Sequence, residues 1–232
     1  MIITCKGLTY AKYDSGGINS AVVYEEGKQL PNLLAKVDVN FEYAEGSDYA
    51  DGIRIAHKKK MTGANVAFEL ADLPKEVKKD WFCWKKSGND LLITETDPET
   101  IGVGFYFWNE EPVTEDDNFV CYWVYKTKFS PDSISGGTSN DSISYQHHNI
   151  TGLAEGIKVE EGGEAIFVAT NEDAFATEAE AIAWLKEKGN IQTEAQGEAQ
   201  GETQGETQGE TQGGGAEGGG SGSETPAAGG GG

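Results

Sequence analysis

The chain has 232 residues and a formal net charge of -21 at pH 7, with 25% charged and 37% hydrophobic residues. A protein this acidic repels phosphate, which argues against tight nucleic-acid binding by counterion release. Its three cysteines are odd in number and far apart, a pattern that fits neither a disulfide framework nor a paired-cysteine metal site. The first ten residues lack the apolar stretch of a secretory signal, and no run of about eighteen apolar residues occurs, so we expect a soluble chain made in the cytoplasm.

The C-terminal segment differs sharply in composition from the rest. From Thr193 a four-residue repeat rich in Gly, Gln and Glu runs on, and the final residues are mostly glycine. No aromatic or branched apolar residue follows Ile191, so burial cannot offset the entropy of ordering this segment. We predict one folded domain over residues 1–190 and a flexible tail over residues 191–232. The tail holds seven glutamates and no basic residue, which leaves the folded part at -14.

The first predicted elements are three antiparallel strands with alternating apolar and polar residues. In the first of them, Val37, Val39 and Phe41 share one face. A loop is predicted over residues 44–52, and a turn is expected where His57 precedes three lysines, with an intersubunit salt bridge at these lysines as the alternative. The three strands are predicted at residues 34–43, 53–56 and 63–70.

A helix should follow these strands and cover one face of their sheet. Asp72 offers a cap and Pro74 suits a first turn. Val77, Trp81 and Trp84 recur at helical spacing, which indicates a buried stripe.

The longest aromatic strand is predicted at residues 120–129. Alternation places Lys126 and Lys128 on one face, and the other face stays apolar throughout. A polar loop over 130–141 and a second alternating strand up to Gln146 are expected next, and shorter strands are predicted at 102–108 and 164–170. The residues of the apolar face are Cys121, Trp123, Tyr125, Thr127 and Phe129.

A closing helix has the strongest local signal in the chain. Thr177 and Glu180 match a capping box worth roughly 1 kcal/mol, and Gly189 supplies a stop. Its buried side should hold Ile182, Trp184 and Leu185. Many strands and few helices predict a mainly β (α+β) domain with helices packed outside.

No residue pattern in the sequence has the spacing of a catalytic or metal-binding site. His147 and His148 are neighbours and would point to opposite faces of a strand, so they cannot ligate one ion together. The acidic stretch around Glu115 lacks the spacing of a calcium loop, and no phosphate-binding or nucleophile motif occurs. We expect no metal, no cofactor and no enzyme activity.

The order of these segments resembles the major tail tube proteins of long, non-contractile tailed phages. The resemblance spans nearly all of Lys6 to Lys188. It rests on SDYADGIRIAHKKKMTGANVAFELADLPKEV, then GVGFYFWN, then NFVCYWVYKTKFSPDSISGGTSNDSISYQHHNITGLAEG, and the closing TEAEAIAWLKEKG. Its most specific parts are the YAD turn, the strand-to-helix passage FELADLPKEV, and the WVYKTKF strand with its loop.

The resemblance implies a tail tube fold, like a β-sandwich or barrel, with long hairpins and flanking helices. Copies would form hexameric rings that stack into a tube, each contributing four long strands to a barrel around the lumen. Genomic DNA would pass through this lumen without specific binding. The partners implied are other copies of the chain, the tape measure protein during assembly, and the tail tip and tail terminator proteins. The chain would belong to the virion tail, assembled in the host cytoplasm, with no membrane contact.

Alternation along the strands gives a hypothesis for the lumen wall, whose acidic side chains would repel DNA phosphates. The alternative is that these side chains face bulk solvent on a monomer. The candidates are Lys36, Asp38, Asn40, Glu42, Asn65, Glu69, Lys126, Lys128, Ser142, Ser144 and Gln146.

Contacts between subunits or rings are predicted in the loops over 44–50 and 130–141, which could equally be plain surface loops. The candidates are Glu45, Ser47, Asp48, Tyr49, Asp132, Ser135, Thr138 and Asn140.

Three competing functions remain open at this point. A carbohydrate-binding β-sandwich would need a row of exposed aromatic residues such as Tyr106, Trp108 and Tyr122. A hydrolase without a recognisable motif is the second alternative. The third is a tube subunit of a phage-like particle, such as a tail-derived bacteriocin.

Overall fold

The computed structural model describes residues 3–51, 53–110, 118–131 and 147–191. The chain divides into the units Met1–Glu194 and Ala195–Gly232, and all described residues lie in the first. The predicted domain boundary at residue 190 stays a prediction. Seven of the candidate residues lie outside the described part, namely Asp132, Ser135, Thr138, Asn140, Ser142, Ser144 and Gln146.

The described part is mainly β, as predicted. Two helices, α1 (Lys75–Phe82) and α2 (Glu178–Lys188), accompany the strands. The strands are β1 (Ile3–Ser15), β2 (Val23–Tyr24), β3 (Lys28–Gln29), β4 (Leu34–Ala50), β5 (Ile53–Leu70), β6 (Lys85–Ser87), β7 (Asp90–Leu92), β8 (Thr100–Asn109), β9 (Phe119–Pro131), β10 (His148–Ala154) and β11 (Val168–Thr170).

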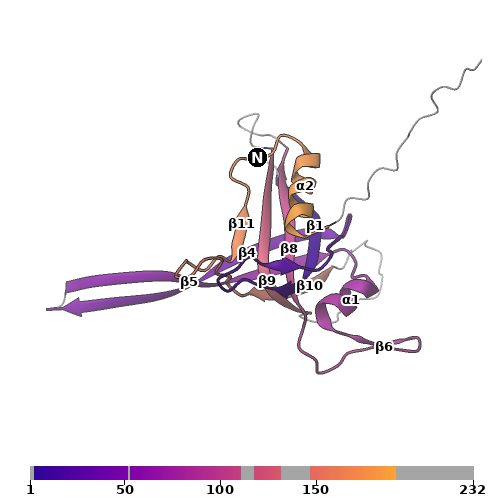
Figure 1. Ribbon diagram of the computed structural model, residues 1–232, viewed down its shortest axis with the longest axis horizontal. Helices are drawn as coiled ribbons and strands as arrows, with labels where there is room; N and C mark the ends of the chain where they lie inside the picture. The colour runs from indigo at the N-terminus through magenta and orange to yellow at the C-terminus, as the bar shows by residue number, and fades with distance from the viewer. Residues whose placement is uncertain (1–2, 52, 111–117, 132–146, 192–232) are drawn as a thin grey trace, which may run out of the picture. The chain divides into compact units, whose positions relative to one another are not determined.

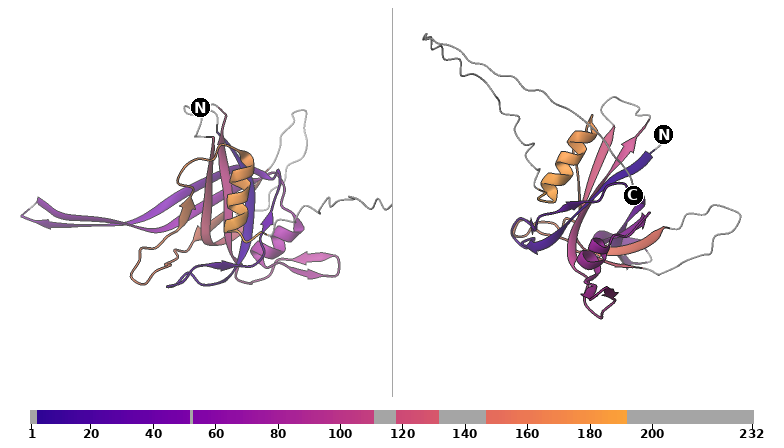
Figure 2. Two further views of the ribbon diagram at one scale, coloured as in Figure 1. Left: turned by 45° about the horizontal axis from the view of Figure 1, so that its top comes forward. Right: turned by 90° about the vertical axis from the view of Figure 1, so that its right-hand side faces the viewer.

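One antiparallel sheet has the strand order β2-β1-β8-β9-β10-β5-β4, with β3 added on β1 and β11 on β9. The strands β6 and β7 form a separate hairpin. Leu8 of β1 and Val37 of β4 belong to the same core cluster although their strands lie near opposite ends of this order. The sheet therefore curls around a core on its inner face (Figure 2).

Helix α1 packs over the inner face of the curled sheet (Figure 1). Trp81 stacks on Phe129 with ring centroids 4.8 Å apart, and its ring meets Tyr10 edge-on at 5.6 Å. The prediction of a covering helix was right, but its start was wrong: Pro74 is the N-cap and makes no side-chain cap bond. Asp72 instead accepts a hydrogen bond from the amide of Leu73.

Helix α2 covers the opposite face of β8 and β9. Ala181 and Leu185 pack there with Trp123 in a second core cluster. The predicted capping box is present, because Thr177 Oγ1 accepts from the Glu180 amide and the Glu180 carboxylate accepts from the Thr177 amide. Of the predicted buried residues, Leu185 is buried, whereas Ile182 and Trp184 are only half-buried. Gly189 is the C-cap, as predicted.

Strand β9 breaks the alternation that the sequence predicts for it. We call the core cluster under α1 the α1 cluster and the second cluster, under α2, the α2 cluster. Trp123 lies in the α2 cluster and Phe129 in the α1 cluster, so these two residues face opposite sides of the sheet. The register between β8 and β9 shifts between Ile101 and Val103, near Lys126, whose φ of 42° is a left-handed conformation rare outside glycine. The prediction of one apolar face throughout was wrong, because this bulge moves every later side chain to the other face.

Strands β4 and β5 are much longer than predicted. The expected loop at 44–50 lies within β4, and the expected turn at His57 and the three lysines lies within β5, which joins the two predicted short strands into one. Both predictions were wrong, because cross-strand pairing continues as far as Ala50 and Ile53. The far halves of these strands pair only with each other among the described residues, and Figure 1 shows them reaching away from the other strands.

Two shorter predictions had different outcomes. The aromatic strand expected at 102–108 is present as β8. The strand expected at 164–170 is shortened to β11, and Ile166 instead forms an isolated bridge with Ile157.

Candidate assembly surface

An open polar face lies on the outer side of four neighbouring strands, β4, β5, β10 and β9. Its side chains alternate with those that point into the core. One row crosses all four strands, because Asn40 pairs with Asn65, Asn65 with Leu153, and Leu153 with Lys128. We call the following set the polar face: Lys36, Asp38, Asn40, Glu42, Asn65, Glu69, Lys128, Ser130, Asn149, Thr151 and Leu153.

The polar face brings together seven of the residues predicted to line a lumen, from Lys36 to Lys128. Whether they face a lumen stays a prediction. Lys126 lies further along β9, at the bulge, and only 15% of its side chain is exposed. Its ammonium lies 4.8 Å from the Tyr13 ring centroid and 3.7 Å from the Glu155 carboxylate, so it is partnered within the chain.

The charges of the polar face are nearly balanced, with an acidic excess. It carries three carboxylates, on Asp38, Glu42 and Glu69, and the two ammonium groups of Lys36 and Lys128. Lys36 Nζ lies 2.6 Å from Asp38, and this hydrogen bond raises the pKa of Lys36 above its usual value. A polyanion sliding along this face would meet no uninterrupted basic stripe.

The projecting halves of β4 and β5, residues 42–50 and 53–63, form a two-stranded ribbon that we call the arm. On one side its residues pair across the ribbon: Lys59 Nζ lies 2.6 Å from Glu45 and 4.5 Å from the Tyr43 ring centroid. The hydrogen bond with Lys59 lowers the pKa of Glu45. Ser47 and His57 are also hydrogen-bonded, at 3.0 Å. This side of the arm is largely satisfied within one chain.

Large apolar side chains are exposed on the arm, mostly at its far end. Tyr49, Ile53 and Ile55 are 62%, 69% and 61% exposed, and Tyr43 is 46% exposed. Residues of this size at such exposure are typical of interaction surfaces when they gather in one region. Glu45, Ser47, Asp48 and Tyr49 were predicted as contacts in a loop, and all four lie on β4. Ile53 and Ile55 on β5 were missed, although their alternation with Arg54 in the sequence indicated a strand with an apolar side.

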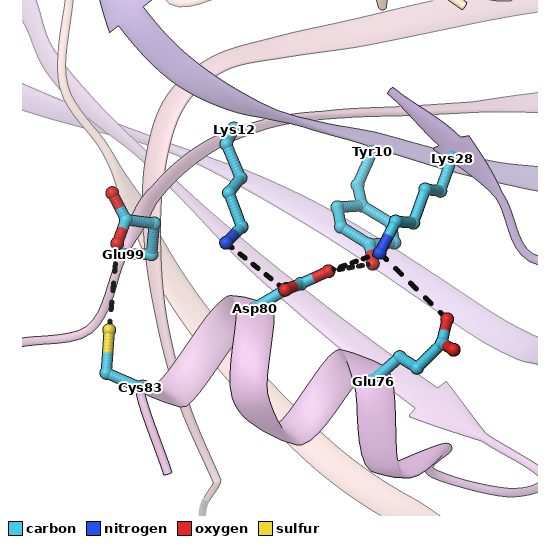
Figure 3. Close-up of polar contacts among 7 residues, drawn as sticks. All are labelled: Tyr10, Lys12, Lys28, Glu76, Asp80, Cys83 and Glu99. Carbon is cyan, nitrogen blue, oxygen red and sulfur yellow. Dashed lines mark hydrogen bonds and ion pairs between the residues drawn. The ribbon is translucent and has the colours of Figure 1, made fainter. Parts of the chain in front are cut away.

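Asp80 of α1 joins the helix to two strands of the sheet (Figure 3). Its carboxylate accepts hydrogen bonds from Tyr10 Oη at 2.7 Å and Lys28 Nζ at 2.9 Å, and Lys12 Nζ lies 3.1 Å away. Burial alone would raise the pKa of Asp80, but these three partners outweigh it and hold the pKa below its usual value. Burial is the larger cause that raises the pKa of Tyr10, and the hydrogen bond to Asp80 is the second cause. These contacts fix α1 over the core that supports the polar face.

A cavity of about 450 Å³ opens where β1 bulges at Gly7. The φ of Gly7 is +72°, and a Cβ there would lie 2.1 Å from the Tyr106 ring, so only glycine fits. The Tyr106 hydroxyl donates a hydrogen bond to Glu178 at the cavity wall.

Within the described ranges, no group of three or more His, Cys, Asp or Glu side chains is arranged to hold a metal ion.

The aromatic residues of the carbohydrate-binding alternative do not form one exposed row. Tyr106 is 2% exposed and packs in the α2 cluster, together with half-buried Trp108. Tyr122 packs against the other cluster, where its ring stacks on Phe105.

No helix among the described residues is long and apolar enough to cross a membrane.

Comparisons with known proteins give little. No known family profile matches the chain, and no curated protein matches it either. Among solved structures, the chain is similar to one from the cryo-EM structure of an extracellular contractile injection system, the PVC sheath-tube complex in its extended state. That chain shares 12% identity with a TM-score of 0.36, over 71% of this chain and 87% of its own length. Values this low do not establish a shared fold.

Proposed function

We propose that this chain is the tube subunit of a tailed phage or phage-like particle, in which copies join side by side into hexameric rings that stack into a tube. The observation that carries this proposal is the outer edge of β4. This strand has 17 residues, and among the described residues it pairs only with β5. A long edge strand leaves a row of backbone groups open to another chain, and a closed ring of subunits covers such edges.

The polar face supports the same proposal. In a ring that continues the sheet through β4, the four strands that carry this face would line the bore. Their core-facing residues, such as Val66 and Phe68, are already buried inside one subunit, so the polar face is the side left for the lumen. Its slight acidic excess would let DNA slide through without adhering.

We assign the chain to the non-contractile tail of a siphophage, where it would conduct genomic DNA to the host cell. Assembly would take place in the host cytoplasm around the tape measure protein, between the tail tip and the tail terminator proteins. In this role the chain acts through assembly, with no catalysis.

The first experiment is negative-stain electron microscopy of the purified chain across a concentration series, with its mass in solution measured in parallel. Hollow tubes or sixfold rings are the expected result, because the β4 edge needs a partner. A protein that stays monomeric even when a tail-tip initiator complex is added would refute the proposal.

The placement of the polar face has a separate test. A bulky maleimide should modify an Asn40→Cys variant rapidly in the monomer and slowly in tubes, because reagent would reach the bore only from the tube ends. A Ser87→Cys variant, on the exposed β6–β7 hairpin, is the matched control for a residue off this face. Equal modification of Asn40→Cys in monomers and tubes would place the polar face on the outer wall.

A further inference from the structure

The two strands of the arm carry opposite charge. Within the arm, β4 has three acidic residues and no basic one, Glu42, Glu45 and Asp48. The arm part of β5, residues 53–63, has four basic residues and no acidic one, Arg54, Lys58, Lys59 and Lys60. In a domain whose net charge is strongly negative, these four cations stand together on one free edge. The arm is therefore a ribbon with one acidic edge and one basic edge.

The two sides of the arm differ in how these charges are paired. The side with the Glu45–Lys59 ion pair is satisfied internally. On the other side each charged residue lies opposite a small one: Glu42 opposite Gly63, Lys60 opposite Ala44, Lys58 opposite Gly46, and Asp48 opposite Ala56. No ion pair within 4.0 Å involves Lys58, Lys60 or Glu42 in the part of the chain that the structure describes. Their counter-charges are not supplied by the strand directly across.

Charge on an edge strand often prevents pairing with other chains. That device works when the edges that would meet carry the same sign, because like charges directly opposite destabilise a sheet. Here a second arm pointing in the same direction would bring its basic β5 edge against the acidic β4 edge of the first. The two strands would run antiparallel, as every ladder of this sheet does. The pattern favours pairing between copies.

We propose that the arms of neighbouring copies pair edge to edge, the acidic β4 edge of one against the basic β5 edge of the next, so that the arms form a continuous antiparallel sheet. The partner is a second copy of this chain. The contact is head-to-tail, because two different edges meet, and repeated contacts of this kind form a ring when the rotation between copies closes. The inference rests on the proposed tube and adds which strands join and in which polarity.

Two charge-inverted variants test this pairing. Lys58→Glu with Lys60→Glu makes all four charged residues of the less paired side of the arm acidic, and Glu42→Lys with Asp48→Lys makes all four basic. Each variant alone should assemble only at about tenfold or higher concentration, because attraction at every interface becomes repulsion. A 1:1 mixture should assemble like the wild type, because alternating copies again bring acidic edges against basic ones. An alternating order is compatible with a ring of six.

Matched controls change the net charge equally at other exposed sites. Lys85→Glu with Lys86→Glu on β6 has the charge change of the acidic variant. Glu160→Lys with Glu161→Lys has that of the basic variant. Both controls should assemble like the wild type. All four inverted side chains on the arm are exposed, so the variants should also keep the wild-type melting temperature and circular dichroism spectrum.

A second measurement separates lost pairing from lost folding. Raising the salt concentration from 0.1 to 1 M shortens the screening length from about 10 to about 3 Å, which should restore assembly of each inverted variant. If the wild type forms tubes and each inverted variant assembles equally well, the arm pairing is overturned, but the proposed function is not. A 1:1 mixture that assembles no better than its components would also overturn the arm pairing. The absence of any tube from the wild type would overturn the proposed function itself.

Discussion

Replacing Asp80 with alanine should destabilise the domain by about 2–4 kcal/mol. The Tyr10 side chain is 1% exposed, so losing its acceptor leaves a buried hydroxyl unsatisfied, at a cost of about 1–3 kcal/mol. The two lysine contacts add less, since Lys12 and Lys28 are 32% and 49% exposed and pairs near the surface contribute about 0.5 kcal/mol each. Adding about 1 kcal/mol for the two pairs to the cost of the buried hydroxyl gives the range of about 2–4 kcal/mol.

The measurement is urea unfolding of four variants, followed by tryptophan fluorescence. Asp80→Asn keeps an oxygen that can accept from Tyr10, so it should cost about 1 kcal/mol, less than Asp80→Ala. Tyr10→Phe removes the hydroxyl that needs an acceptor, so the double variant with Asp80→Ala should cost less than the sum of the two single changes. An Asp80→Ala variant within about 0.5 kcal/mol of the wild type would refute the reasoning, and so would strict additivity.

The pH dependence of this contribution has a fixed sign. The folded pKa of Asp80 lies below its usual value, so the stabilisation is fully present above the unfolded pKa of about 3.9. It is lost as the pH falls from there through the lower folded pKa. The difference in stability between the wild type and Asp80→Asn should therefore be constant near neutral pH and shrink in acid. A difference that grew in acid would contradict the assignment.

Three further predictions concern the core and its helices. Gly104→Ala should cost about 1–3 kcal/mol in urea unfolding, because its Cβ would lie 2.5 Å from Trp123 and 2.7 Å from Leu185, whereas Gly46→Ala, with open space around it, should change little. Thr177→Ala removes half of the capping box and should cost about 1 kcal/mol, and an unchanged midpoint would speak against the cap. Burial raises the pKa of Cys121 to about 12, so a thiol reagent at pH 8 should leave it unmodified until urea unfolds the chain; rapid modification of Cys121 in the native protein would show that the α2 cluster opens.

The sequence alone determined features that depend on neighbours along the chain. The Thr177–Glu180 capping box was predictable because both partners lie within one helical turn. The inward direction of Val37 and Val39 was predictable in the same way, since side chains alternate on any strand, whereas Phe41, predicted on the same face, is 46% exposed. That alternation also grouped the residues of the polar face correctly from Lys36 to Glu42.

Only the tertiary structure decided how far each strand extends and where alternation breaks. Residues 44–50 read as a loop because Gly46, Ser47 and Asp48 disfavour strands, yet pairing with β5 holds them in one. The bulge at Lys126 has no local signal, because no glycine marks its positive φ, and it moves Phe129 to the opposite face from the one predicted. Asp80 reaches Tyr10 across 70 residues, a contact that no spacing in the sequence reveals. Bulges, strand lengths and such contacts depend on partners distant in the chain, which is why the arm became visible only once β4 and β5 were paired.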